Sequence, residues 1–239
     1  IHCHTAFTDD QVEFGAPLEA AVFGAYCAGM SWIAATDHSY DLDDLTGNYL
    51  ISDPSLGKWR VLRETAALLN GSLDSIAVIP GEEVTCRTRR GRNCHMLALG
   101  SEKFIPGSGD GGERGLLHAT ERSVGEAARE INEWGGIACA AHPLEHIPYV
   151  ERLFLGRGPW GREDLETTGV TAIQIHNGVR DSGFRKGMAE WIGLLLAGRR
   201  VSAFGGNDSH GDMNRRRSIG IPLLNVRESP DHVLGRVRT

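Results

Sequence analysis

Residues 123–143, SVGEAAREINEWGGIACAAHP, decide the fold class of this chain. Ser123 is a candidate N-cap for a helix over Val124–Trp134, because a serine side chain can accept a hydrogen bond from the first helical turn. After two glycines, the apolar run Ile137–Ala140 predicts a buried strand, and His142 follows that strand closely. A helix, a strand and a histidine at the carboxyl end of the strand form a unit that the rest of the chain repeats with variations.

The same alternation of apolar β-type runs and helical segments extends along the chain. Helices are predicted over Pro17–Gly29, Trp59–Asn70, Val124–Trp134 and Phe184–Ala197, and strands over Trp32–Thr36, Ile76–Ile79, Cys94–Leu99, Ile137–Ala140, Thr171–Ile175 and Val201–Phe204. Such alternation implies right-handed crossovers and a parallel sheet, open or closed. The glycine-rich stretch 106–115, PGSGDGGERG, is expected to be a loop at the mouth of a barrel rather than a linker.

Length and charge narrow the class of protein. The 239 residues, 41% of them hydrophobic, suit a single domain over 1–239, because one α/β barrel takes about 200–250 residues. A net charge of −6 argues against a nucleic-acid partner, and no apolar run reaches the roughly 18 residues of a membrane span. Because the chain starts at Ile1 without a methionine, we expect its extreme N-terminus to be missing, which leaves a removed export signal open. Oligomeric state is not readable from the sequence.

The cysteines predict a reducing compartment. Their number is odd and they form no C-x-x-C pair, which disfavours a disulfide framework or a zinc ribbon. The five residues are Cys3, Cys27, Cys86, Cys94 and Cys139. We therefore expect scattered reduced thiols and a cytoplasmic protein.

Histidines and carboxylates gather where predicted strands end. His2 and His4 are two residues apart, which on a strand places both rings on one face, and Asp208 with His210 repeats this spacing. Four further positions lie within or just after predicted strands: His38, Glu83 after a Pro80-Gly81 turn, His95 and His142. Because sites of parallel α/β sheets lie at the carboxyl ends of strands, these groups are expected to share one rim. Nitrogen and oxygen ligands without thiolates suit Zn²⁺, Mn²⁺ or Fe²⁺.

The order of these motifs resembles the PHP (polymerase and histidinol phosphatase) family of metal-dependent hydrolases. The motifs are HCHTAFTD at 2–9, TDH at 36–38, GEE at 81–83, the strand residue His95, AHP at 141–143 and DSH at 208–210. They extend from the first residues to about Gly220, and details such as PGEEVT and GGNDSHGDMNR are closest to the bacterial branch with carbaryl hydrolase-like proteins. Thr8 stands where the family pattern has serine, which is a mild departure.

The resemblance implies a distorted (β/α)₇ TIM-like barrel with two or three divalent metal ions, Zn, Mn or Fe. Its ligand sets would be His2, His4, Glu83 and Asp208 for the first ion, Glu83, His95 and His142 for the second, and Asp9, His38 and His210 for a third. Neighbours in an extended segment point to opposite faces, so only one of Glu82 and Glu83 can bridge two ions. Family spacing favours Glu83 as this bridging carboxylate, and it favours Asp9 over Asp10 as the ligand.

Candidate acid–base and substrate residues flank these ligands. Asp37 adjoins His38 and is expected to orient a histidine, while His176 could protonate a leaving group or be a buried, satisfied histidine. Guanidinium groups bind phosphate well, so arginines close to the ligands are candidate substrate contacts. The substrate candidates are Arg89, Arg92, Asn177, Arg215 and Arg216.

Together these features predict hydrolysis by a metal-activated water, since no Gly-x-Ser-x-Gly motif indicates a serine nucleophile. The flanking arginines favour a phosphoesterase acting on a small anionic metabolite or nucleotide. A carbamate, ester or amide hydrolase on the same site is an alternative, as is a non-catalytic metal-binding module. An amidohydrolase barrel with a carboxylated lysine is disfavoured, because none of the three lysines stands at a suitable strand end: Lys58, Lys103 and Lys186.

Overall fold

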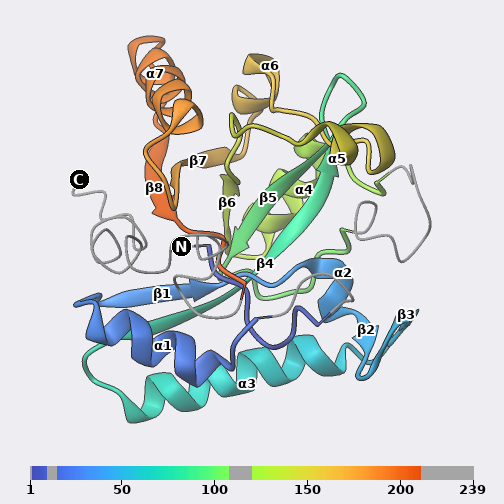
Figure 1. The fold of residues 1–239 in the computed structure, drawn as a ribbon, viewed down its shortest axis with the longest axis vertical. Helices are drawn as coiled ribbons and strands as arrows, with labels where there is room; N and C mark the ends of the chain where they lie inside the picture. The colour runs from blue at the N-terminus through green and yellow to red at the C-terminus, as the bar shows by residue number, and fades with distance from the viewer. Residues whose placement is uncertain (1, 10–14, 108–119, 211–239) are drawn as a thin grey trace.

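The computed structural model describes residues 2–9, 15–107 and 120–210 as a mixed α/β fold built on a curled sheet (Figure 1). The main sheet has six strands in the order β1 (Trp32–Ala35), β4 (Ala77–Arg87), β5 (Asn93–Leu99), β6 (Ile137–Ala140), β7 (Val170–Asn177) and β8 (Ser202–Gly206). A separate hairpin pairs β2 (Asp44–Leu45) with β3 (Asn48–Ser52). The helices are α1 (Leu18–Cys27), α2 (Ser39–Leu42), α3 (Gly57–Ser72), α4 (Val124–Glu133), α5 (Tyr149–Phe154), α6 (Arg162–Leu165) and α7 (Ser182–Leu196).

The expectation of a purely parallel sheet is wrong at β5. This strand runs antiparallel to both β4 and β6, whereas the β1–β4, β6–β7 and β7–β8 pairs are parallel. The chain reverses between β4 and β5 in a tight turn, in which Thr88 N donates to Arg92 O at 2.8 Å and Gly91 has a φ of 73°. A connection this short can join antiparallel strands only, because a parallel crossover needs a dozen or more residues.

The predicted turn at Pro80-Gly81 is also wrong, since β4 continues through it to Arg87. Residues Ala77–Pro80 pair with β1, and residues from Gly81 onward pair with β5. Pro80 therefore lies where β4 changes partners, and its lack of an N–H group costs little there. This continuation carries Glu83 into the middle of a long strand.

The N-terminal segment joins the two edges of the sheet. His4 N donates to Ser209 O at 3.0 Å on the β8 side, and Thr36 N donates to Cys3 O at 2.8 Å on the β1 side. These bonds bring the first residues of the chain between β1 and β8. Within the described residues the sheet thus has six assigned strands plus this bridging segment, and the expected count of seven strands is not confirmed.

Helix α4 shows how local sequence sets an element. Ser123 Oγ accepts from Glu126 N at 3.3 Å and Ser123 N donates to the Glu126 carboxylate at 2.9 Å, which confirms the predicted cap as a capping box. Its buried face consists of Val124, Ala127, Ala128 and Ile131. All four predicted helices are present with ends that differ by at most a few residues from the prediction.

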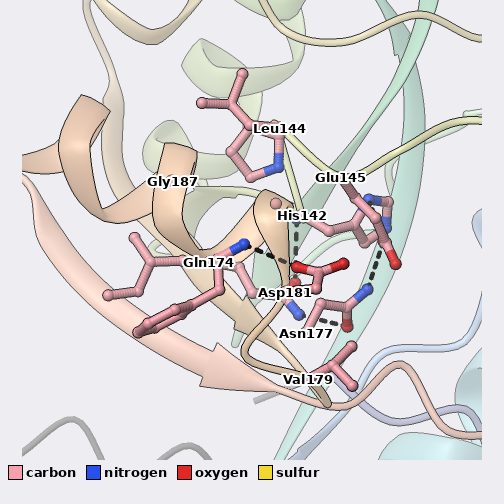
Figure 2. A pocket seen from close by; sticks show the side chains of 12 residues that line it. His142, Leu144, Glu145, Gln174, Asn177, Val179, Asp181 and Gly187 are labelled. Carbon is pink, nitrogen blue, oxygen red and sulfur yellow. Dashed lines mark hydrogen bonds and ion pairs between the residues drawn. The ribbon is translucent and has the colours of Figure 1, made fainter.

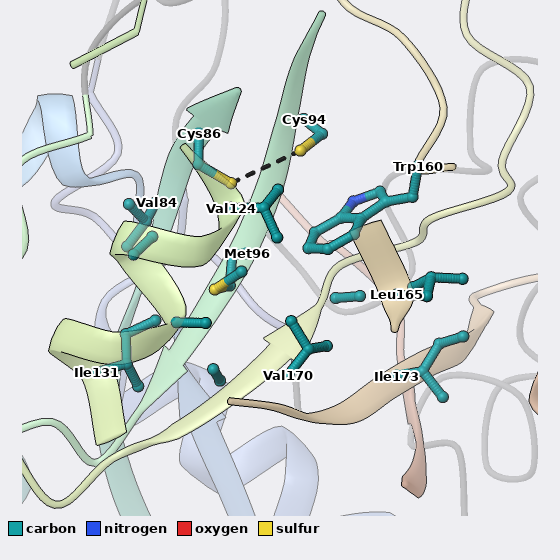
Figure 3. Close-up of a cluster of buried hydrophobic side chains, with 14 of the residues drawn as sticks. Val84, Cys86, Cys94, Met96, Val124, Ile131, Trp160, Leu165, Val170 and Ile173 are labelled. Carbon is teal, nitrogen blue, oxygen red and sulfur yellow. Dashed lines mark hydrogen bonds between the residues drawn. The ribbon is translucent and has the colours of Figure 1, made fainter. Parts of the chain in front are cut away.

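The larger hydrophobic core lies between α4 and strands β4 to β8 (Figure 3). Val84, Met96 and Ile131 pack there with Leu165 and Ile173, all of them essentially inaccessible to solvent. Cys86 and Cys94 face each other across the β4–β5 hairpin with 3.6 Å between their sulfur atoms. All five cysteines are free thiols, as the sequence predicted. Among the described helices, none combines the length and apolarity that crossing a membrane requires.

Candidate metal centre

Glu83 lies at the centre of a buried cluster of histidines. Its backbone is fixed in β4 beside the Thr36–His38 segment, where Glu83 N donates to Asp37 O at 2.8 Å. The side chain is 1% exposed, and its two oxygens face different histidines. Oε2 is 3.2 Å from His2, 3.3 Å from His4 and 3.1 Å from His38, whereas Oε1 is 2.8 Å from His95 and 3.1 Å from His142. One carboxylate therefore faces two separate sets of nitrogen atoms.

The first set combines His2, His4, Glu83 and Asp208. His2 Nε2 and His4 Nε2 are 3.2 Å apart, and Asp208 Oδ1 is 3.5 Å from the first and 3.1 Å from the second. Four ligands at about 2.1 Å from a tetrahedral ion would lie about 3.4 Å apart, so the donor atoms already have the spacing that an ion requires. The structure brings together all four residues that were predicted for the first ion.

The second set combines Glu83, His95 and His142. His95 reaches it from the beginning of β5, because the antiparallel direction of that strand brings its amino end to this side of the sheet. His142 reaches it from just beyond β6, as the sequence indicated. Both histidines lie about 3 Å from Glu83 Oε1, whereas His2 and His4 lie near Oε2, so each carboxylate oxygen faces its own set.

The third set differs from the prediction in one member. His38 and His210 do lie together, but the group that they form is completed by His4. Asp9 instead pairs with the buried Lys58, with 2.5 Å between Nζ and Oδ1. The structure therefore does not bring Asp9 to the ligand sets, and Asp10 lies outside the described residues.

Burial and mutual contacts shift the charges in the centre. Burial disfavours the Glu83 carboxylate, but the surrounding rings of His2, His95 and His38 outweigh this and hold the pKa of Glu83 well below its usual range. Burial likewise opposes a charged His4, yet hydrogen bonds to Asp208 and Glu83 raise the pKa of His4 well above its usual range. Burial lowers the pKa of His2. These shifts keep Glu83 negatively charged, which favours a cation beside it.

Glu82 faces the opposite side of β4. Ser39 Oγ and Ile105 N each donate to its carboxyl group at 3.1 Å. Burial raises the pKa of Glu82 to about 8. The two adjacent glutamates therefore have opposite surroundings, as alternation along a strand requires.

Asp37 is linked to His4 by hydrogen bonds through Thr8. Its carboxylate accepts four hydrogen bonds, from the backbone N–H and the hydroxyl of both Thr5 and Thr8, at 2.6–3.1 Å. The Thr8 hydroxyl is also 3.1 Å from His4 Nδ1. Asp37 thus acts on His4 through Thr8 and leaves Nε2 of the ring directed at the ligand set.

Two of the ligand candidates have strained backbones. His142 has a φ of 26° and Asp208 a φ of 50°, a left-handed region that non-glycine residues rarely adopt. Such strain costs of order 1–3 kcal/mol and persists where the surrounding structure imposes it, often at functional sites. The strain at both positions fits a role that depends on side-chain placement.

The structure describes two of the four arginines that were predicted as substrate contacts. Arg89 and Arg92 are exposed in the β4–β5 turn, where Arg89 N donates to Asp164. Arg215 and Arg216 lie outside the described residues. Sequence reasoning missed Arg157, whose Nη2 is 3.2 Å from His95 Nε2 while Nη1 donates to Glu151 at 2.9 Å. No motif marks this arginine, because its segment reaches His95 through tertiary pairing with Asn93.

His176 and Asn177 end β7 in different surroundings. The ring of His176 is buried against Phe184 of α7, with ring centroids 5.7 Å apart, and it belongs to none of the ligand sets. Asn177 is close to the centre, because its Nδ2 donates to Glu145 at 2.6 Å and lies 3.4 Å from Asp208 Oδ2. A pocket opens here, with His142, Glu145, Asn177 and Asp181 in its lining (Figure 2).

Comparison with known proteins identifies the fold. No protein-family model matches the chain, and no curated protein does either. Among solved structures, a protein of Bifidobacterium adolescentis described provisionally as a metal-dependent phosphoesterase is 17% identical, with a TM-score of 0.56 over 99% of this chain and 96% of the other. An amidohydrolase from Chromobacterium violaceum is 18% identical, with a TM-score of 0.53 over 88% of this chain and 86% of the other. The chain shares the fold of these two proteins. At these identities the likeness concerns the fold, so the chemistry has to be argued from the site itself.

Proposed function

We propose that this chain is a PHP-type metal-dependent hydrolase that cleaves a phosphoester bond in a small phosphorylated metabolite or nucleotide. The observation that carries the proposal is the Glu83 carboxylate, with one oxygen facing His2, His4 and His38 and the other facing His95 and His142. A carboxylate surrounded in this way is suited to hold two cations side by side.

The donor atoms fit divalent ions of the Zn, Mn or Fe type, since they are imidazole nitrogens and carboxylate oxygens without a thiolate. When bound, two or three such ions would activate water near neutral pH and polarise the scissile bond. Glu83 would set the spacing of the first two ions, and Asp208 would balance their charge. His4, His38 and His210 would hold a third ion, with His4 shared between two sets.

Phosphoester cleavage is favoured by positive charge beside the second set. The guanidinium of Arg157 stands next to His95, where it can meet the non-bridging oxygens of an anionic substrate. Carbamate, ester or amide cleavage on the same site is the alternative, in keeping with the fold shared with an amidohydrolase. A purely structural metal site is disfavoured, because the strained, partly accessible His142 borders an open pocket.

The test is a substrate screen on protein stripped of metal and reloaded with Mn²⁺, Zn²⁺ or Fe²⁺. We expect hydrolysis of p-nitrophenyl phosphate or nucleotides that exceeds hydrolysis of carbamate esters. Carbamate cleavage without any phosphatase activity would contradict the phosphoesterase assignment and leave the hydrolase assignment in place. Failure to bind any of these ions would contradict both.

The variant His38→Ala should distinguish phosphoester cleavage from carbamate cleavage. A phosphate monoester develops charge on several oxygens, and each lost electrostatic contact typically costs about 10²–10³ in rate. Carbamate cleavage develops one oxyanion and depends less on a third ion. We therefore expect this variant to lose phosphatase turnover strongly while it retains the ions of the first two sets, as measured by metal analysis.

A further inference from the structure

The side-chain amide of Gln174, on β7, forms hydrogen bonds through both of its polar atoms beside the metal centre. It is 1% exposed, and each hydrogen-bonding position of its amide has a partner. Oε1 lies 2.9 Å from His2 Nδ1 and accepts from His142 N at 3.3 Å. Nε2 donates to His176 O at 3.3 Å and to Asn177 Oδ1 at 3.0 Å. A buried amide with four partners is held in one orientation.

Two backbone groups determine which way this amide points. The N–H of His142 can only donate, so the atom that faces it must be the amide oxygen. The carbonyl of His176 can only accept, so the atom that faces it must be the amide nitrogen. His2 Nδ1 therefore faces an acceptor and must carry a proton, which makes Nε2 the ring nitrogen that faces His4, Glu83 and Asp208 and would bind an ion.

The same amide reaches a second ligand through Asn177. Because Asn177 Oδ1 accepts from Gln174, Asn177 Nδ2 is the group that donates to Glu145 (Figure 2). The same Nδ2 approaches Asp208 Oδ2. Residues three apart on a regular strand would face opposite ways. A bulge makes the contact possible, since Gln174 pairs with Phe204 and His176 pairs with Gly205, which leaves Ile175 as the extra residue.

We propose that Gln174 is a positioning residue that fixes the tautomer of His2 directly and the placement of Asp208 through Asn177. It would thereby align two ligands of the first ion and, through its bond to His142 N, a ligand of the second. This inference rests on the proposed function, because it assigns Gln174 to the metal centre described there. Outer partners of this kind typically change metal affinity by about 10–100-fold when they are removed.

Three variants separate positioning from general stability. Gln174→Met keeps the size of the side chain but removes its hydrogen bonds, whereas Gln174→Glu keeps the oxygen that accepts from His2. Asn70→Leu is the matched control, because Asn70 is a structural amide that bonds the backbone of Val78 at 2.7 and 2.8 Å in a different part of the fold. It should lower the melting temperature without affecting the metal centre.

Two measurements decide the proposal. Imidazole ¹H–¹⁵N correlation spectra of metal-free protein at pH 8 report the tautomer of His2, with the resonance assigned through a His2→Gln variant. Calorimetric titration with Zn²⁺ reports metal affinity. We expect a protonated Nδ1 in wild type and Gln174→Glu, partial loss of that proton in Gln174→Met, and roughly 10–100-fold weaker Zn²⁺ binding in Gln174→Met.

A wild-type His2 without a proton on Nδ1 would overturn the proposal. So would a Gln174→Met variant with wild-type tautomer and affinity, or a control Asn70→Leu that loses Zn²⁺ to the same degree. Wild-type protein that binds no Zn²⁺, Mn²⁺ or Fe²⁺ would instead contradict the proposed function, while the tautomer of the metal-free ring would still test Gln174.

Discussion

At the scale of single residues, the adjacent Glu82 and Glu83 have side chains in opposite surroundings. Glu83 touches five histidine rings, whereas Glu82 is bonded to Ser39 and Ile105 on the other face of β4. Glu83→Gln should abolish activity and lower metal content, because an amide removes the charge shared by two ions. Glu82→Gln, the matched control, should leave both largely intact. Metal analysis and turnover measurements check this, and the reverse pattern would mean that Glu82 is the bridging residue.

Glu82 should also make stability depend on pH. Its folded pKa of about 8 lies above the ordinary value of 4.5, so the folded state retains a proton that the unfolded state has released. Wild-type stability should therefore fall as pH rises from about 4.5 to about 8, by roughly 3–5 kcal/mol at most. Glu82→Gln mimics the protonated form and should lack this loss. Urea unfolding of metal-free wild type and variant at pH 5 and pH 8.5 measures the free energy of unfolding. A difference in stability between the two proteins that is the same at both pH values would contradict the raised pKa of Glu82.

At the scale of elements, β8 approaches the N-terminal segment closely at Gly206. A Cβ atom there would lie 2.6 Å from His2 Cβ and 2.9 Å from Gln174 Nε2. Gly206→Ala should thus displace His2, cost about 1–3 kcal/mol of stability and reduce metal affinity. Gly71→Ala is the control, because Gly71 lies in α3 with open space around its Cβ position. Thermal melts and metal titration compare the two variants. Wild-type stability and metal affinity in Gly206→Ala would show that β8 can shift to accommodate the added methyl group.

At the scale of the whole molecule, the centre ties distant parts of the chain together. His2 and Asp208 belong to one ligand set although they are 206 positions apart in the sequence. Ions bound by the folded state alone stabilise it by about 2.7 kcal/mol at 100 times their dissociation constant. Chelation should therefore lower the melting temperature by several degrees, and the shift should vanish in Glu83→Gln. Calorimetry with and without chelator measures this. An unchanged melting temperature in wild type would argue against metal in this centre.

The sequence by itself determined the local elements and the chemical character of the centre. Apolar runs predicted the strands, Ser123 predicted a helix start as a candidate N-cap, and the spacing of His2 and His4 placed two rings on one face. These features depend on neighbours within a few residues, so they are readable from the chain. For the same reason, the alternation of side chains along an extended strand was enough to place Glu82 and Glu83 on opposite faces.

Tertiary structure decided whatever depends on partners far away in the sequence. The antiparallel direction of β5, the ion pair of Asp9 with Lys58 and the position of Arg157 beside His95 all follow from pairing between segments. The bulge in β7 shifted the strand phase, so that Gln174 and Asn177 meet while His176 packs against Phe184. A one-residue shift of this kind leaves no mark in local composition, because it results from how β7 fits against β8.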